Sequence, residues 1–170
     1  MKALSYILIG FGLFMVSCAN IKDQKKADVN EVIHTAPPVN DSVIFWYEME
    51  EGISLAKDQN KMIFVDVYTD WCGWCKKMDA STFKDKSVIK ALNQDYIAVK
   101  FDGEERDSIN FFGTAYKFVD NGRRGYHELA AVLLDGRLSY PSFVVLNNNG
   151  TREKKMIGYM NPEQLIMQLK

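Results

Sequence analysis

The sequence has few cysteines, almost no net charge and no apolar run long enough for a membrane-spanning helix at its start. Three cysteines in 170 residues exclude a small scaffold held together by several disulfides. Lys and Arg number 21 against 22 Asp and Glu, giving a formal net charge of -1. This balance argues against a nucleic-acid-binding protein held by a basic field, and against a polyacidic tail. The 47% hydrophobic and 25% charged residues are typical of one globular domain with appendages.

The first residues have the pattern of a secretory signal. A short positive start is followed by uncharged residues 3–16, fewer than the roughly 20 that a spanning helix needs. Cys18 then lies between two small residues, and the segment resembles a bacterial lipoprotein signal, although Met15 and Val16 depart from its commonest form. The resemblance implies a signal peptide over residues 1–17, lipidation of Cys18 and an extracytoplasmic, periplasmic location. An ordinary cleaved signal with an incidental cysteine is the alternative.

A polar segment separates this leader from the domain. Residues 18–40 have no amphipathic period and close with Pro37-Pro38. They are expected to form a flexible tether, so that only the lipid anchor would touch the membrane. A disordered tail without a function is the alternative reading. The globular domain is expected over residues 41–170.

Within this domain, helical and strand-like periods alternate. The nearly continuous apolar run at residues 61–68 is typical of a strand buried on both faces. We expect helices over residues 46–59, 72–78, 83–93 and 163–169, and strands over residues 61–68, 96–101, 142–146 and 151–158, the last two joined by a turn at residues 147–150. This order predicts an α/β fold with a central mixed sheet flanked by helices.

The long segment between residues 102 and 138 carries two patches with helical spacing. One contains Ile109, Phe112, Ala115, Tyr116 and Val119, and the other covers residues 126–134. An exposed loop at residues 121–125 separates them. We expect both patches to be helices that pack over the sheet, with His127 and Glu128 serving as structural or surface residues.

The remaining two cysteines, Cys72 and Cys75, follow directly after the expected buried strand. A cysteine at a helix N-terminus faces unpaired backbone N–H groups, which stabilise its thiolate, so Cys72 is the predicted nucleophile. Cys75, one turn later, can attack a mixed disulfide on Cys72 and release the substrate. Lys76 stands where haem attachment requires His, and a structural zinc site would need four ligands, so no metal is predicted. A copper carrier with two thiolates is the open alternative.

The hexapeptide Trp-Cys-Gly-Trp-Cys-Lys at residues 71–76 resembles the active site of the thioredoxin superfamily, and the resemblance covers residues 41–170. It implies a thioredoxin-like fold and a redox-active Cys72–Cys75 disulfide as the only cofactor. Asp66, six residues before Cys72, matches a buried acid that moves protons during resolution. Lys100 matches a partner of that acid, with a solvated lysine as the equal alternative.

The resemblance also implies a substrate site around the cysteines. Tyr140-Pro141 matches the cis-proline segment of the family, whose backbone pairs with an extended substrate chain. Trp71 and Trp74, with Gly73 between the cysteines, are expected to add a docking surface beside the nucleophile.

Three departures from plain thioredoxins refine the expected function: Gly-Trp between the cysteines, a helical insertion before the cis-Pro strand, and the leader. Together they resemble secreted thioredoxin-like proteins of bacterial envelopes, relatives of thiol-disulfide interchange domains that pass electrons across membranes. The implied partners are protein thiols or disulfides and a membrane electron-donor protein, with no nucleic acid. Trp74 carries no charge to stabilise a thiolate, which favours a disulfide reductase or isomerase over an oxidant. A non-catalytic binding module is the alternative.

Overall fold

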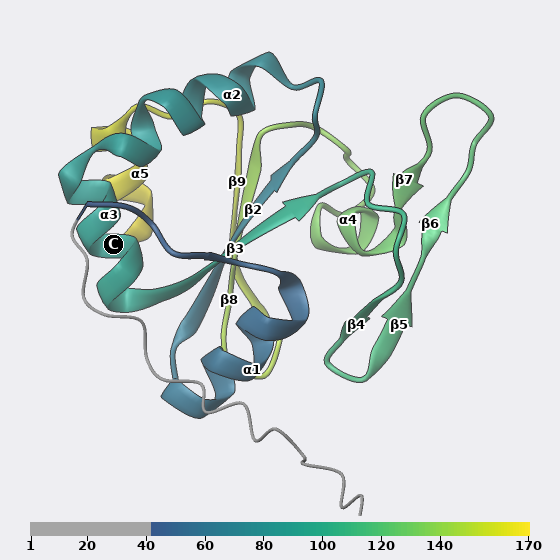
Figure 1. The fold of residues 1–170 in the computed structure, drawn as a ribbon, viewed down its shortest axis with the longest axis horizontal. Coiled ribbons are helices and arrows are strands. Elements are labelled where there is room, and N and C mark those ends of the chain that lie inside the picture. The colour runs from purple at the N-terminus through teal and green to yellow at the C-terminus, as the bar shows by residue number, and fades with distance from the viewer. Residues whose placement is uncertain (1–41) are drawn as a thin grey trace, which may run out of the picture. The chain divides into compact units, whose positions relative to one another are not determined.

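The computed structural model of this chain describes residues 42–170 (Figure 1). The expected signal peptide at residues 1–17, the lipidation site Cys18 and the tether at residues 18–40 lie outside the described residues. None of the helices within residues 42–170 is long and apolar enough to cross a membrane.

A five-stranded mixed sheet forms the centre of the described domain, in the order β1-β3-β2-β8-β9. Its central strand β2 pairs in parallel with β3 and antiparallel with β8, which fixes the register on both edges. The strands are β1 (Trp46–Tyr47), β2 (Met62–Tyr68), β3 (Tyr96–Asp102), β8 (Ser142–Leu146) and β9 (Arg152–Ile157). The predicted mixed sheet of an α/β fold is confirmed.

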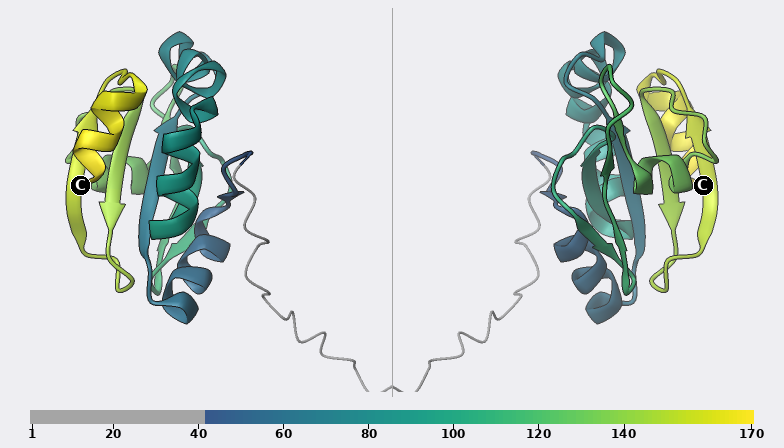
Figure 2. Two further views of the ribbon diagram at one scale, coloured as in Figure 1. Left: turned by 90° about the vertical axis from the view of Figure 1, so that its left-hand side faces the viewer. Right: turned by 90° about the vertical axis from the view of Figure 1, so that its right-hand side faces the viewer.

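Helices cover both faces of this sheet (Figures 1 and 2). One face packs against α1 (Met49–Gln59) and α4 (Glu128–Leu133). The other packs against α2 (Gly73–Ala80), α3 (Lys86–Asp95) and α5 (Pro162–Leu169). The fold is therefore a three-layer sandwich, in which the sheet has no solvated face along its central strand.

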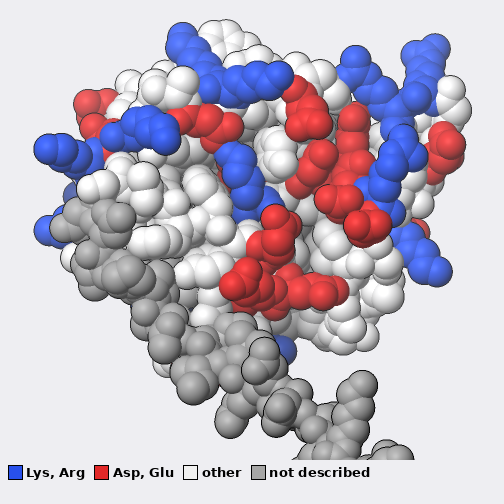
Figure 3. Space-filling model, viewed as in Figure 1, with Lys and Arg blue, Asp and Glu red and all other residues white. Residues whose placement is uncertain are grey.

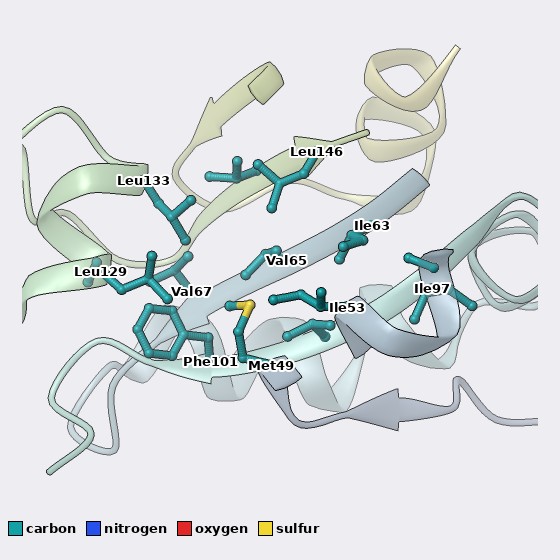
Figure 4. Close-up of a cluster of buried hydrophobic side chains, with 14 of the residues drawn as sticks. Met49, Ile53, Ile63, Val65, Val67, Ile97, Phe101, Leu129, Leu133 and Leu146 are labelled. Atoms are coloured by element: carbon teal, nitrogen blue, oxygen red, sulfur yellow. The ribbon is translucent and has the colours of Figure 1, made fainter. Parts of the chain in front are cut away.

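The alternation of side chains along β2 explains its continuous apolar sequence. Ile63, Val65 and Val67 point into the cluster shared with α1 and α4, and Figure 4 shows them meeting side chains from both helices. Phe64 points into the opposite cluster, under α2 and α3. Because both faces are buried, neither set of positions can be polar without a cost, and Asp66 is the one charged residue on this strand.

Two predicted helices begin later than their apolar spacing indicated. Trp46 lies in β1, where it pairs in parallel with β3, and α1 begins only at Met49. Phe83 lies in a short 3₁₀ turn at Thr82–Lys84, and α3 begins at Lys86. Asp85 caps α3, because its carboxylate accepts the N–H groups of two residues in the first turn.

The first half of the insertion is not helical, and that prediction is wrong. A hairpin forms instead from β4 (Ile109–Phe111) and β5 (Thr114–Tyr116), followed by a second hairpin of β6 (Phe118–Val119) and β7 (Tyr126–His127). Phe112 and Gly113 both have positive φ angles, 49° and 90°, which turn the chain back within two residues. The second patch, expected to be helical over residues 126–134, is helical only as α4 (Glu128–Leu133), because Tyr126 and His127 pair in β7.

Replacement of Gly52 tests the packing of α1 on the sheet. A Cβ atom at this helical position would lie 2.3 Å from Cγ2 of Val99 on β3. We expect Gly52→Ala to lower the free energy of unfolding by about 1–3 kcal/mol through overpacking, despite alanine's better helix propensity. Asp58→Ala, an exposed change in the same helix, should stay within about 0.5 kcal/mol in denaturant titrations. A more stable Gly52→Ala protein would contradict this packing.

Candidate active site

The two cysteines lie where β2 ends and α2 begins. Cys72 is the N-cap of α2 and is joined to Cys75 by a disulfide that spans the first helical turn. The backbone N–H of Cys75 donates to Sγ of Cys72 at 3.1 Å. In a reduced pair the same N–H and the positive end of the helix would favour the Cys72 thiolate, which is the property required of a nucleophile.

Two tryptophans flank this buried disulfide and remain largely exposed. Trp71 is 52% and Trp74 56% exposed, whereas both cysteines are buried. The Trp74 ring packs against that of Tyr159 with centroids 5.3 Å apart, and the Lys77 ammonium lies over both rings. Exposed aromatic rings beside a reactive group provide contact area for a partner. Gly73, between the cysteines, is exposed, with open space where a Cβ would lie.

The segment before β8 completes one side of the site. The Tyr140-Pro141 peptide bond is cis, as predicted. Pro141 accepts a hydrogen bond from the N–H of Gly158 at 2.8 Å. The Tyr140 ring meets the Trp71 ring edge-on, with centroids 5.9 Å apart. The structure therefore brings Tyr140 into contact with Trp71, the predicted docking residue that directly precedes Cys72.

Asp66 is buried, with 2% of its surface exposed. It lies near the middle of β2, opposite Lys100 in the register with β3. Its Oδ2 lies 3.2 Å from Nζ of Lys100, which also pairs with Asp79 of α2. Burial raises the pKa of Asp66 to about 6, against the opposing effect of Lys100. Oδ1 of Asp66 has no hydrogen-bond partner among the described residues. Lys100 is thus the partner of the acid and not a freely solvated lysine.

His127 has the structural role expected of it. Its buried ring caps α4, because Nδ1 accepts the N–H of Leu129 at 3.2 Å. Nε2 then carries the proton and lies 3.2 Å from the carbonyl oxygen of Asp107. Burial lowers the pKa of His127. The neighbouring Glu128 accepts the backbone N–H of Lys117. Both residues therefore hold the insertion in place.

Several residues that lie around the cysteines could not be identified as site residues from the sequence. Glu104 accepts the indole N–H of Trp71 at 2.9 Å, and the guanidinium of Arg124 lies 4.6 Å from the centroid of the same ring. An open cleft of about 330 Å³ beside them is lined by Asp70, Asp102, Glu104, Glu105, Arg106 and Arg124. Figure 3 shows basic side chains gathered over the β6–β7 hairpin next to a band of acidic ones. These contacts arise from the folding of the insertion, which local patterns do not reveal.

Metal-binding side chains do not cluster in the described part of the chain. Over residues 42–170, no group of three or more His, Cys, Asp or Glu side chains has a geometry that could hold a metal ion.

Comparisons with known proteins identify relatives of this domain. The family model Thioredox_DsbH, described as "Protein of unknown function, DUF255", matches residues 33–140. Human spermatogenesis-associated protein 20 is 33% identical over 66 residues, covering 38% of this chain and 8% of that protein. The thiol:disulfide interchange protein DsbD of Colwellia psychrerythraea is 38% identical over 63 residues, covering 37% of this chain and 10% of that protein. The chain therefore matches only a small part of the length of these curated relatives.

A solved structure shows the same fold. A thioredoxin from Thermus thermophilus superposes with a TM-score of 0.54 at 19% sequence identity, covering 75% of this chain and 85% of that one. The thioredoxin-like fold expected from the sequence is confirmed.

The raised pKa of Asp66 predicts a pH dependence of stability. Between pH 3.8 and about 6 the folded protein holds a proton that the unfolded chain has lost, so stability falls as the pH rises through this range. Asp66→Asn should remove this dependence. Its free energy of unfolding relative to wild type should therefore rise between pH 4 and 7, by on the order of 3 kcal/mol.

Chemical denaturation of the oxidised proteins at several pH values measures this difference, because the disulfide-bonded cysteines do not titrate. Asp79→Asn, at the more exposed partner of Lys100, is the matched control and should leave most of the dependence in place. Parallel stability curves for Asp66→Asn and wild type would show that Asp66 does not have a raised pKa.

Proposed function

This chain belongs to the Thioredox_DsbH family of thioredoxin-like proteins, and on that basis we propose that Cys72 and Cys75 catalyse thiol-disulfide exchange in protein substrates. The observation that carries the proposal is the Cys72–Cys75 disulfide at the N-terminus of α2. A pair in this position can cycle between dithiol and disulfide without any other cofactor. The similarity to a thiol:disulfide interchange protein supports the same chemistry.

In the reducing direction, the Cys72 thiolate attacks one sulfur of a substrate disulfide. The substrate S–S bond breaks, one substrate sulfur leaves as a thiolate, and a mixed disulfide joins Cys72 to the other. The Cys75 thiol then gives its proton to the Asp66 carboxylate, and the Cys75 thiolate attacks Sγ of Cys72. The second substrate thiolate leaves, and two electrons have passed from the cysteine pair to the substrate.

The buried position of Asp66 supports its role as the proton acceptor. A carboxyl group whose pKa is raised to about 6 holds a proton more readily than an exposed aspartate, and can exchange it near neutral pH. Pro141 and the backbone of Tyr140 would shape the groove in which an extended substrate chain lies beside Cys72.

The surroundings of the Cys72 sulfur support a proposal for the direction of exchange. A strong oxidant needs a reduced form in which the thiolate is strongly stabilised, and Trp74 between the cysteines supplies no charge for that. We therefore propose a reductase or isomerase. Another thiol-disulfide protein at the membrane would return electrons to the Cys72–Cys75 disulfide after each cycle.

The leader supports an extracytoplasmic location for this chemistry. The match to a lipoprotein signal at residues 15–18 would make Cys18 the lipidated N-terminus of the mature chain. The domain would then be held on a bacterial membrane, facing the periplasm, by its lipid alone. Cys72 and Cys75 would be the only free thiols of the mature protein.

Substitution of each cysteine tests the proposed reaction. Cys72→Ser should reduce the insulin-reduction rate to that of the buffer containing dithiothreitol alone, because the nucleophile is lost. Cys75→Ser should instead accumulate mixed disulfides between Cys72 and substrate proteins, which non-reducing gels and mass spectrometry identify. If Cys72→Ser retains the wild-type rate, a non-catalytic binding module becomes the better account.

Metabolic labelling tests the proposed anchor. Cells that express the full chain with radiolabelled palmitate should incorporate label into wild type and not into Cys18→Ser, which lacks the thiol that accepts the lipid. Cys75→Ser is the matched control and should be labelled like wild type. Equal labelling of all three proteins, or of none, would contradict lipidation at Cys18.

A further inference from the structure

Three contacts hold the exposed Trp71 side chain in one orientation. Its ring meets Tyr140 edge-on, its indole N–H donates to Glu104, and the guanidinium of Arg124 stacks over its face. Without such contacts, a tryptophan that is 52% exposed would sample several rotamers beside Cys72. The contacts come from three different segments, so the orientation of Trp71 is set by the tertiary structure and not by its own backbone.

Hydrogen bonds in the turn of the β6–β7 hairpin fix the backbone on both sides of Arg124. In this turn, Oδ1 of Asn121 accepts the backbone N–H groups of Arg123 at 3.2 Å and Gly125 at 3.1 Å, which brackets Arg124. A Cβ at Gly125 would lie 2.2 Å from the Phe118 ring, so the hairpin closes tightly behind the turn. Ordered hydrogen bonds on both sides of Arg124 fix where its side chain leaves the backbone.

The base of the same hairpin is attached to the end of β3. The N–H of His127 donates to the carbonyl oxygen of Gly103 at 2.8 Å, and the buried His127 ring caps α4. Gly103 leaves room for the Tyr140 ring, whose hydroxyl oxygen would lie 2.4 Å from a Cβ at this position. Gly103 therefore connects the hairpin with Tyr140, and Glu104 follows directly after it.

We propose that Arg124 is a positioning residue for the thiol-disulfide exchange. Arg124 holds the Trp71 ring against Tyr140, so that the ring forms one side of the site in which an extended segment of a protein substrate lies. The inference rests on the proposed function, since it assigns a role to the insertion in that reaction. Trp71 directly precedes Cys72, and Tyr140 directly precedes Pro141. The Trp71–Tyr140 contact thus joins the nucleophile to the segment along which a substrate chain would lie.

Because Arg124 acts through the Trp71 ring, its effect is expected to differ between protein substrates and small disulfides. An extended chain that reaches Cys72 must also lie along the Trp71 ring, and benefits from a ring already held in place. A small aliphatic disulfide such as hydroxyethyl disulfide can contact the sulfur without covering the indole. The contribution of Arg124 should therefore appear in the KM for proteins and not in the chemistry at Cys72.

The first experiment reads the position of Trp71 without any activity. In a ¹⁵N-labelled protein, Trp71→Phe identifies the Trp71 indole N–H signal by its loss. Arg124→Ala should shift this signal and speed its hydrogen exchange, whereas Arg123→Ala, a change at the exposed neighbour in the same turn, should not. An unchanged Trp71 signal in Arg124→Ala would overturn the inference.

The second experiment measures substrate discrimination. Arg124→Ala should raise the KM for insulin roughly two- to five-fold, the effect expected for the loss of one exposed cation–π contact, with kcat nearly unchanged. Its rate with hydroxyethyl disulfide and its reduction potential should stay at wild-type values. Arg124→Lys should recover part of the effect, because an ammonium also stacks on an indole.

A double substitution shows whether Arg124 acts through Trp71. In a Trp71→Ala background, Arg124→Ala should not raise the KM for insulin further. An additive effect, or an equal loss with hydroxyethyl disulfide, would overturn the positioning role. A wild-type protein that does not reduce insulin would overturn the proposed function and the docking role together. In that case the indole N–H signal of Trp71 would still show whether Arg124 holds the Trp71 ring in place.

Discussion

The position of Cys72 at the junction of β2 and α2 is the constraint on which the rest of the site depends. β2 is paired on both edges and buried on both faces, so it cannot slide without moving apolar side chains into the wrong layer. Its end therefore fixes the start of α2, and with it the N–H group of Cys75 that points at the Cys72 sulfur. The electrostatic setting of the Cys72 sulfur thus follows from sheet packing and helix geometry, and not from a charged neighbour between the cysteines.

The same strand carries a charge that packing alone would not favour. Asp66 interrupts an otherwise apolar strand, and an unpaired carboxylate there would be costly. The parallel register with β3 sets Lys100 directly opposite, and the Lys100 ammonium lies within 6 Å of the ring centroids of Trp46, Tyr68 and Phe83. The pair is therefore held in place, but the carboxyl group still has a pKa raised to about 6. A buried carboxyl group with this pKa supports the proposed role of Asp66 in proton transfer.

Short sequence patterns predict those elements of the fold in which the apolar residues follow a single helical or strand spacing. The run at residues 61–68 predicts the buried strand and the cysteine pair after it predicts a redox site, whereas the cis Tyr140-Pro141 bond is expected only from the resemblance to the thioredoxin superfamily. The spacing of Ile109, Phe112 and Tyr116 suits a helix, but it also suits a hairpin once Phe112 adopts a positive φ, and nothing in the sequence marks a phenylalanine for that conformation. The contacts of Glu104 and Arg124 with Trp71 could not be predicted, because they depend on how the insertion folds back on the sheet.

The most direct test of Cys72 as the proposed nucleophile is which cysteine reacts first in the reduced protein. Brief treatment with substoichiometric iodoacetamide at neutral pH, followed by peptide mass spectrometry, measures the label on Cys72 and Cys75 separately. Cys72 is expected to carry nearly all of the label, because its sulfur accepts the N–H at the start of α2 and Cys75 lies one turn inside the helix. Preferential labelling of Cys75, or equal labelling of both, would contradict Cys72 as the nucleophile and with it the proposed reaction.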